Sequence, residues 1–175
     1  MEGEQQMEEK PQMQEGSQSY DIEDLKPIEA GEMQDLSEYE GKKVKIEKTE
    51  VIELDSNYAV EKVEIDGKTF NAGEQLPPGK TVKSKALKVT TEKVGEVKTS
   101  EGEVKELRAS ELLSLKKKSD GSWGWSTHKK SKIQKLFVRL KAKYGELTHP
   151  KDLIGKEVTI IIRPGEDISW LGFMI

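Results

Sequence analysis

Residues 116–144 read KKKSDGSWGWSTHKKSKIQKLFVRLKAKY and contain the one convincing amphipathic helix pattern of the chain. Apolar side chains recur there at i, i+3, i+4, i+7 and i+11, which places them on one helical face. They are Ile133, Leu136, Phe137, Leu140 and Tyr144. Ser131 and Gln134 have the spacing of an N-terminal capping box, and Gly145 is a typical stop signal. We therefore predict a single helix that begins at Ser131 and ends at Gly145.

Alternating apolar and polar residues predict strands on both sides of this helix. A break in the alternation at residues 48–50 predicts that the first strand bends or bulges. Asp66-Gly67 predicts a tight hairpin turn, and we expect Trp170, rather than Phe173, to face the core. The strand segments are 43–54, a hairpin at 58–71, 81–94, a strand pair at 96–107, 108–115 (strand or short helix), and a closing hairpin at 158–162 and 168–175.

Apart from the hairpin at 58–71, the order of elements is strand, strand, strand, helix, strand, strand. This order resembles an OB-fold, as do the segment Leu-Ile-Gly-Lys-Glu-Val at 153–158 and the Trp-Leu-Gly-Phe strand at 170–173. The resemblance implies a mainly β protein: a five-stranded barrel with one helix between strands 3 and 4, of a kind that commonly binds single strands. A β-sandwich or an SH3-like barrel accommodates the strands but accounts less naturally for one late helix.

Charge divides the 175 residues into two predicted parts. Residues 1–40 hold 13 acids and two lysines, and we predict that they form an acidic, largely disordered tail. Residues 41–175 hold 27 basic and 20 acidic groups, and we predict that they form the OB-like domain. The tail either only solubilises the protein or acts as a tethered anion that competes for the cationic surface.

Composition excludes several classes of protein. The chain has no cysteine, which rules out disulfides and fits a cytoplasmic location. It has no apolar run of about 18 residues, so we expect no membrane partner. Its 26 lysines and three arginines favour a thermophile or an AT-rich genome. His128 and His149 have no carboxylate at ligand spacing, and motifs of known catalytic sites are absent, so we expect no enzyme activity, no cofactor and no metal.

The candidate binding residues are cationic and aromatic. Trp123 and Trp125 stand two apart, so in an extended segment both rings face one side and offer a platform for stacked bases; alternatively, one or both plug the end of the barrel. The basic candidates are Lys129, Lys130, Lys132, Lys135, Arg139 and Lys143, followed by Lys83, Lys85 and Lys88 on the second long strand. A solvated helix face also explains such a basic stripe, but the absence of acids from 121 to 145 favours binding.

These residues predict binding of single-stranded DNA or RNA, mainly through phosphates and stacking, with the acidic tail moderating affinity. The alternative is a protein-interaction adaptor or inhibitor that docks on a replication or transcription assembly through residues 1–40.

Overall fold

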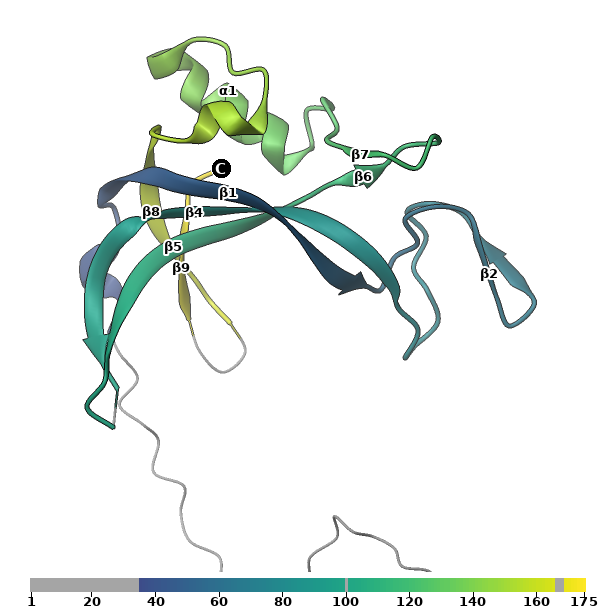
Figure 1. Cartoon of the computed structure of the whole chain (residues 1–175), viewed down its shortest axis with the longest axis horizontal. Coiled ribbons are helices and arrows are strands. Elements are labelled where there is room, and N and C mark those ends of the chain that lie inside the picture. The colour runs from purple at the N-terminus through teal and green to yellow at the C-terminus, as the bar shows by residue number, and fades with distance from the viewer. Residues whose placement is uncertain (1–34, 100, 166–168) are drawn as a thin grey trace, which may run out of the picture. The chain divides into compact units, whose positions relative to one another are not determined.

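The structure is a computed structural model, and it describes residues 35–99, 101–165 and 169–175 (Figure 1). The predicted acidic tail therefore lies outside the described residues, apart from its last six positions. In the described ranges no helix is long and apolar enough to cross a membrane.

Five strands form one antiparallel sheet in the order β5-β4-β1-β8-β9. They are β1 (Lys43–Ser56), β4 (Val82–Lys98), β5 (Val104–Ser114), β8 (Glu157–Arg163) and β9 (Trp170–Phe173). The long β1 pairs with β8 through residues 43–45 and with β4 through residues 46–56. Within the pairing with β4 the register shifts between Ile46 and Lys48, which confirms the predicted irregularity.

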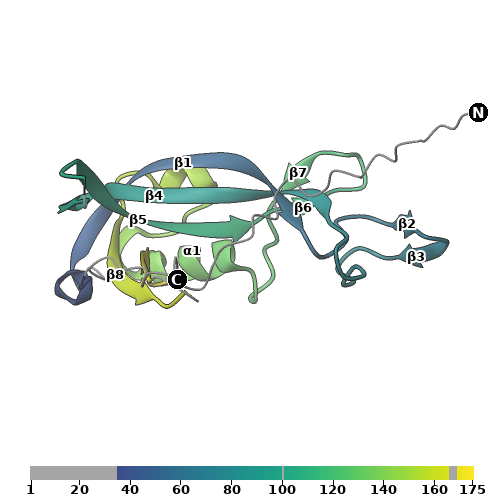
Figure 2. The same cartoon turned by 90° about the horizontal axis from the view of Figure 1, so that it is seen from below.

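Two short hairpins form separate two-stranded sheets. β2 (Val63–Ile65) and β3 (Lys68–Phe70) pair across Asp66 and Gly67, whose φ angles of 51° and 80° confirm the predicted tight turn. Figure 2 shows this hairpin projecting beyond the ends of β1 and β4. The second hairpin joins β6 (Lys116–Lys117) to β7 (Trp123–Gly124), a pairing that the sequence analysis did not predict.

The helix α1 (Lys132–Tyr144) begins and ends where the sequence predicted. The hydroxyl of Ser131 accepts from the backbone N–H of Gln134 at 3.5 Å, and the N–H of Gly145 donates to Lys141 O at 2.9 Å. Its apolar face packs into the main core with Ile46, Leu113 and Phe173. The helix therefore covers one face of the sheet (Figure 1).

The folded body starts before Gly41. Ser37–Tyr39 form a 3₁₀ turn (η2), and Tyr39 is buried to 6% exposure. Its ring lies on Gly95 of β4, where an added Cβ would come within 2.8 Å of the ring carbon Cε1. Leu36 packs against the same core. The end of the predicted tail thus packs on the body through Leu36 and Tyr39.

The prediction that Trp170 faces the core is wrong. Trp170 is 47% exposed, whereas Phe173 is fully buried. The register explains the difference, because Phe173 lies opposite the buried Ile160 and shares its face with the buried Leu171. Trp170 has the opposite phase and points away from this core.

The buried carboxylate of Glu111 connects β5 to the β8–β9 hairpin at the other end of the sheet order. β5 and β9 lie side by side, although the described pairings do not join them as neighbours in the sheet. Glu111 of β5, whose side chain is 8% exposed, accepts from Arg163 Nε at 2.8 Å and from the backbone N–H of Phe173 at 3.2 Å. Gly172 leaves room for this carboxylate, because a Cβ at position 172 would clash with Glu111 Oε1. The same Cβ would also come within 2.8 Å of Arg163 Cγ.

We expect Glu111→Ala to lower the free energy of unfolding by about 2–4 kcal/mol, because it leaves a guanidinium and a buried N–H without their shared acceptor. Urea denaturation measures this loss. Glu146→Ala, which breaks the exposed pair with Lys141, is the matched control and should cost less than about 1 kcal/mol. Equal losses in the two variants would contradict the connecting role of Glu111.

Candidate nucleic-acid interface

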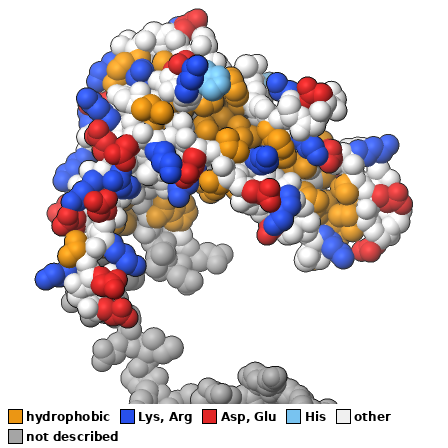
Figure 3. All heavy atoms as spheres, viewed as in Figure 1, with side chains coloured by type: hydrophobic (Ala, Val, Ile, Leu, Met, Phe, Trp, Pro, Cys, Tyr) orange, Lys and Arg blue, Asp and Glu red, His pale blue; other side chains and the backbone are white. Residues whose placement is uncertain are grey.

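Both predicted tryptophans line one open cleft of about 500 Å³, which we call the tryptophan cleft. Its walls include Val51, Lys85, Trp123, Trp125, His149 and Lys151. The volume lies within the range of small-ligand sites. Figure 3 shows a band of apolar side chains that runs past a histidine between the helical layer and the β2–β3 hairpin.

The β6–β7 hairpin fixes the two rings. Lys116 lies opposite Gly124, and the loop turns at Gly121 with a φ of 88°. The hydroxyl of Ser122 donates to Asp120 at 2.6 Å, and this bond lowers the pKa of that carboxyl. Trp123 and Trp125 therefore flank the buried Gly124 on a braced hairpin and reach the same cleft.

The two rings have different surroundings. Lys85 Nζ lies 5.8 Å from the centroid of Trp123, within range of a cation–π interaction. Trp125 packs against the main core and meets His149 edge to face, with centroids 5.2 Å apart. Both are half-buried, an arrangement between the two alternatives from the sequence, an open platform and a sealed plug.

His149 is a wall of the cleft that the sequence analysis did not assign to binding. It caps the short helix Pro150–Leu153 (η3), and its Nδ1 accepts from the N–H of Lys151 at 3.1 Å. Asp152 accepts from the backbone N–H groups of Thr148 and His149, and these bonds hold the pKa of its carboxyl below the usual value. In the sequence, the capping-box spacing of His149 and Asp152 was the signal that could have indicated this cap.

The structure distributes the predicted basic residues over several places. Lys85 lines the tryptophan cleft, whereas Lys83 pairs with Asp55 at 2.9 Å. Lys143 pairs with Glu157 at 3.0 Å, and this hydrogen bond raises the pKa of the lysine. The other helix and loop candidates are exposed and form no ion pair with another described residue: Lys129, Lys130, Lys132, Lys135 and Arg139.

Lys88 and Lys132 both line a second hollow of about 410 Å³, which we call the Trp170 groove. Trp170 and Leu112, each 47% exposed, form its apolar part with Ile52. Sequence analysis missed this arrangement, because Leu112 stands in an apolar run and Trp170 in a strand that reads as buried. The groove and the tryptophan cleft use opposite faces of the sheet, since Lys88 and the cleft residue Leu87 are adjacent on β4.

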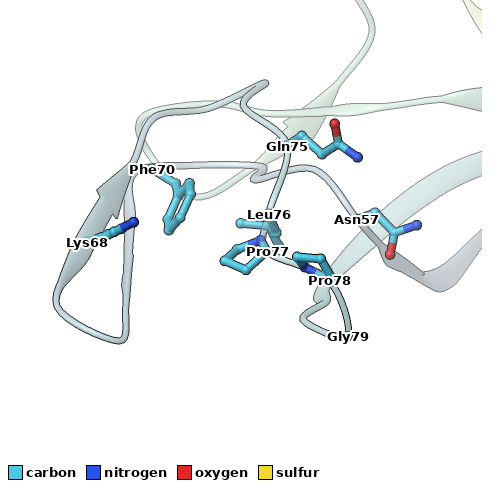
Figure 4. Close-up of a pocket in the computed structure, with 8 residues that line it drawn as sticks. All are labelled: Asn57, Lys68, Phe70, Gln75, Leu76, Pro77, Pro78 and Gly79. Atoms are coloured by element: carbon cyan, nitrogen blue, oxygen red, sulfur yellow. The ribbon is translucent and has the colours of Figure 1, made fainter.

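A third pocket of about 640 Å³ lies between β3 and the loop that precedes β4. Figure 4 shows the Phe70 ring turned towards Leu76 and Pro77, with the Lys68 ammonium beside it. Asn57 and Gln75 line the other side. None of the predicted binding residues is in this pocket.

No family model, curated protein or solved structure matches this chain. In the described part of the chain, no group of three or more His, Asp or Glu side chains is placed to hold a metal ion.

The different surroundings of the two cleft rings predict different effects on stability. Trp125→Ala removes core packing and should lower the free energy of unfolding by about 2–3 kcal/mol. Trp123→Ala, the matched control, removes a ring held mainly by the hairpin and Lys85 and should cost about 1 kcal/mol or less. Urea denaturation checks both, and a larger loss for Trp123→Ala would contradict the assignment.

Proposed function

We propose that this chain binds single-stranded nucleic acid, with bases stacked in the tryptophan cleft and phosphates held by the lysines around it. The observation that carries the proposal is the presence of two tryptophan rings in one open cleft with Lys85 and Lys151. Flat rings stack on any base, and each such contact contributes about 1–3 kcal/mol. Cations beside the rings attract the backbone regardless of sequence.

We also propose that the five strands form an OB-like barrel. The strand order β5-β4-β1-β8-β9, the proximity of β5 and β9, and a helix between β5 and β8 all support this proposal. The bridge from Glu111 to Arg163 and Phe173 supplies a contact across the remaining gap. Barrels of this kind commonly bind single strands.

The electrostatics of the cleft are compatible with a phosphate backbone. One acid, Glu50, lines the cleft, and its carboxylate is paired with Lys48 at 3.0 Å. Residues 126–145, which follow Trp125, contain no acid and include the exposed Lys129 and Lys130. Contacts of this type give affinity with little readout of base sequence.

We expect dodecathymidylate to quench tryptophan fluorescence, with a log–log salt slope near −3.5 if about five phosphates are contacted. Replacing both Lys129 and Lys130 by glutamine should reduce the slope to about −2.1, because two phosphate contacts are lost. Lys98→Gln with Lys105→Gln is the matched control, since it removes equal charge from the β4–β5 ribbon. Unchanged emission together with no gel shift at low salt would refute the proposed function.

The acidic N-terminal segment gives a second prediction. Residues 1–34 hold ten acids and two lysines, and a tethered polyanion competes at high effective concentration with nucleic acid. Deletion of residues 1–34 should therefore tighten binding of dodecathymidylate and change the salt slope little. The deletion ends there because Leu36 and Tyr39 pack on the body.

A full-length variant with these ten acids replaced by Asn or Gln is the control for charge, and it should bind as tightly as the deletion variant. Weaker binding after deletion would show that the segment assists the interaction instead of competing with it.

A further inference from the structure

We infer that the bound strand continues from the tryptophan cleft, over the loop at residues 126–131, into the Trp170 groove, where Trp170 stacks a further base. This inference rests on the proposed function and extends it to a second subsite. It assigns a binding role to Trp170 and Leu112, which lie outside the predicted site.

The Trp170 groove has the chemistry of a stacking site. Trp170 leaves nearly half of its surface exposed beside the equally exposed Leu112. Lys88 and Lys132 flank these side chains, and neither pairs with an acid among the described residues. An exposed indole between two available cations suits a base followed by its phosphate.

The one carboxylate in the groove does not oppose an anionic ligand strongly. Glu111 lines the groove, but its Oε1 already accepts from Arg163 and from the N–H of Phe173. The guanidinium at 2.8 Å offsets the charge of this carboxylate.

A short cationic loop connects the two hollows. Trp125 lines the cleft and Lys132 lines the groove, so seven residue steps separate them, at most about 25 Å of chain. Local bonds hold the loop: the N–H of His128 donates to Ser126 Oγ at 3.1 Å, and the N–H of Lys130 donates to His128 Nδ1 at 3.2 Å. Lys129 and Lys130 are exposed on this loop, between Trp125 and Lys132 in the sequence.

The sheet allows the same path. Leu112, near the C-terminal end of β5, lines the groove, and Leu115, just beyond that end, lines the cleft. A nucleic-acid strand that passes around the C-terminal end of β5 reaches both faces without crossing the sheet. Site sizes of about 4–16 nucleotides per OB-fold cover such a distance.

The three tryptophans of the chain permit a direct test with dodecathymidylate. The variant Trp123→Phe with Trp125→Phe keeps Trp170 as the only indole, and its emission should be quenched by the strand. The variant Trp170→Phe reports on the cleft alone and should also be quenched. Phenylalanine preserves a ring at each position, and thermal unfolding verifies that both variants fold.

Affinity provides the second readout. Trp170→Ala should weaken binding of dodecathymidylate by about 5- to 150-fold, the equivalent of one stacked base. Val104→Ala is the matched control, because Val104 is an exposed apolar residue on the β4–β5 ribbon, and it should leave affinity unchanged.

The outcomes separate the two claims. Quenching of Trp170→Phe, with binding but no quenching in the variant that retains only Trp170, would overturn the inference and leave the proposed function standing. Unchanged affinity of Trp170→Ala would overturn the inference in the same way. Absence of any binding by the unmodified chain would instead refute the proposed function.

Discussion

The arrangement of the body depends on the carboxylate of Glu111. It links β5 to the β8–β9 hairpin, and it replaces ladder bonds with two side-chain hydrogen bonds. A buried carboxylate is costly unless it is paired and hydrogen-bonded, and Arg163 and the N–H of Phe173 meet both needs. Gly172 is part of the same arrangement, because a larger residue would displace the carboxylate.

The bulge in β1 is the second constraint. β1 pairs with β8 along one edge through residues 43–45 and with β4 along the other edge through residues 46–56, and the register of the β4 pairing shifts between Ile46 and Lys48. The remainder of β1 then extends beyond β8, and Val51 there becomes an exposed wall of the tryptophan cleft. The long strand that joins the two parts of the sheet therefore also supplies part of the candidate site.

The two hollows combine the same ingredients in different ways. In the tryptophan cleft, the rings are braced by a hairpin and by His149, and the cations come from β4 and the η3 turn. In the Trp170 groove, an exposed ring stands between Lys88 and Lys132. One acid lines each hollow, and each is paired with a neighbouring cation: Glu50 with Lys48, and Glu111 with Arg163. The remaining charge that lines both hollows comes from lysines.

Local patterns in the sequence were enough to determine the helix with its caps, the turn at Asp66-Gly67, the irregular first strand and the closing hairpin. Each of these depends on the periodicity or turn chemistry of a few neighbouring residues. Only the tertiary structure decided that Trp170 points outward and that His149 meets Trp125. Those outcomes depend on strand register and on contacts between distant segments, and one residue of register reverses the face of every side chain in a strand.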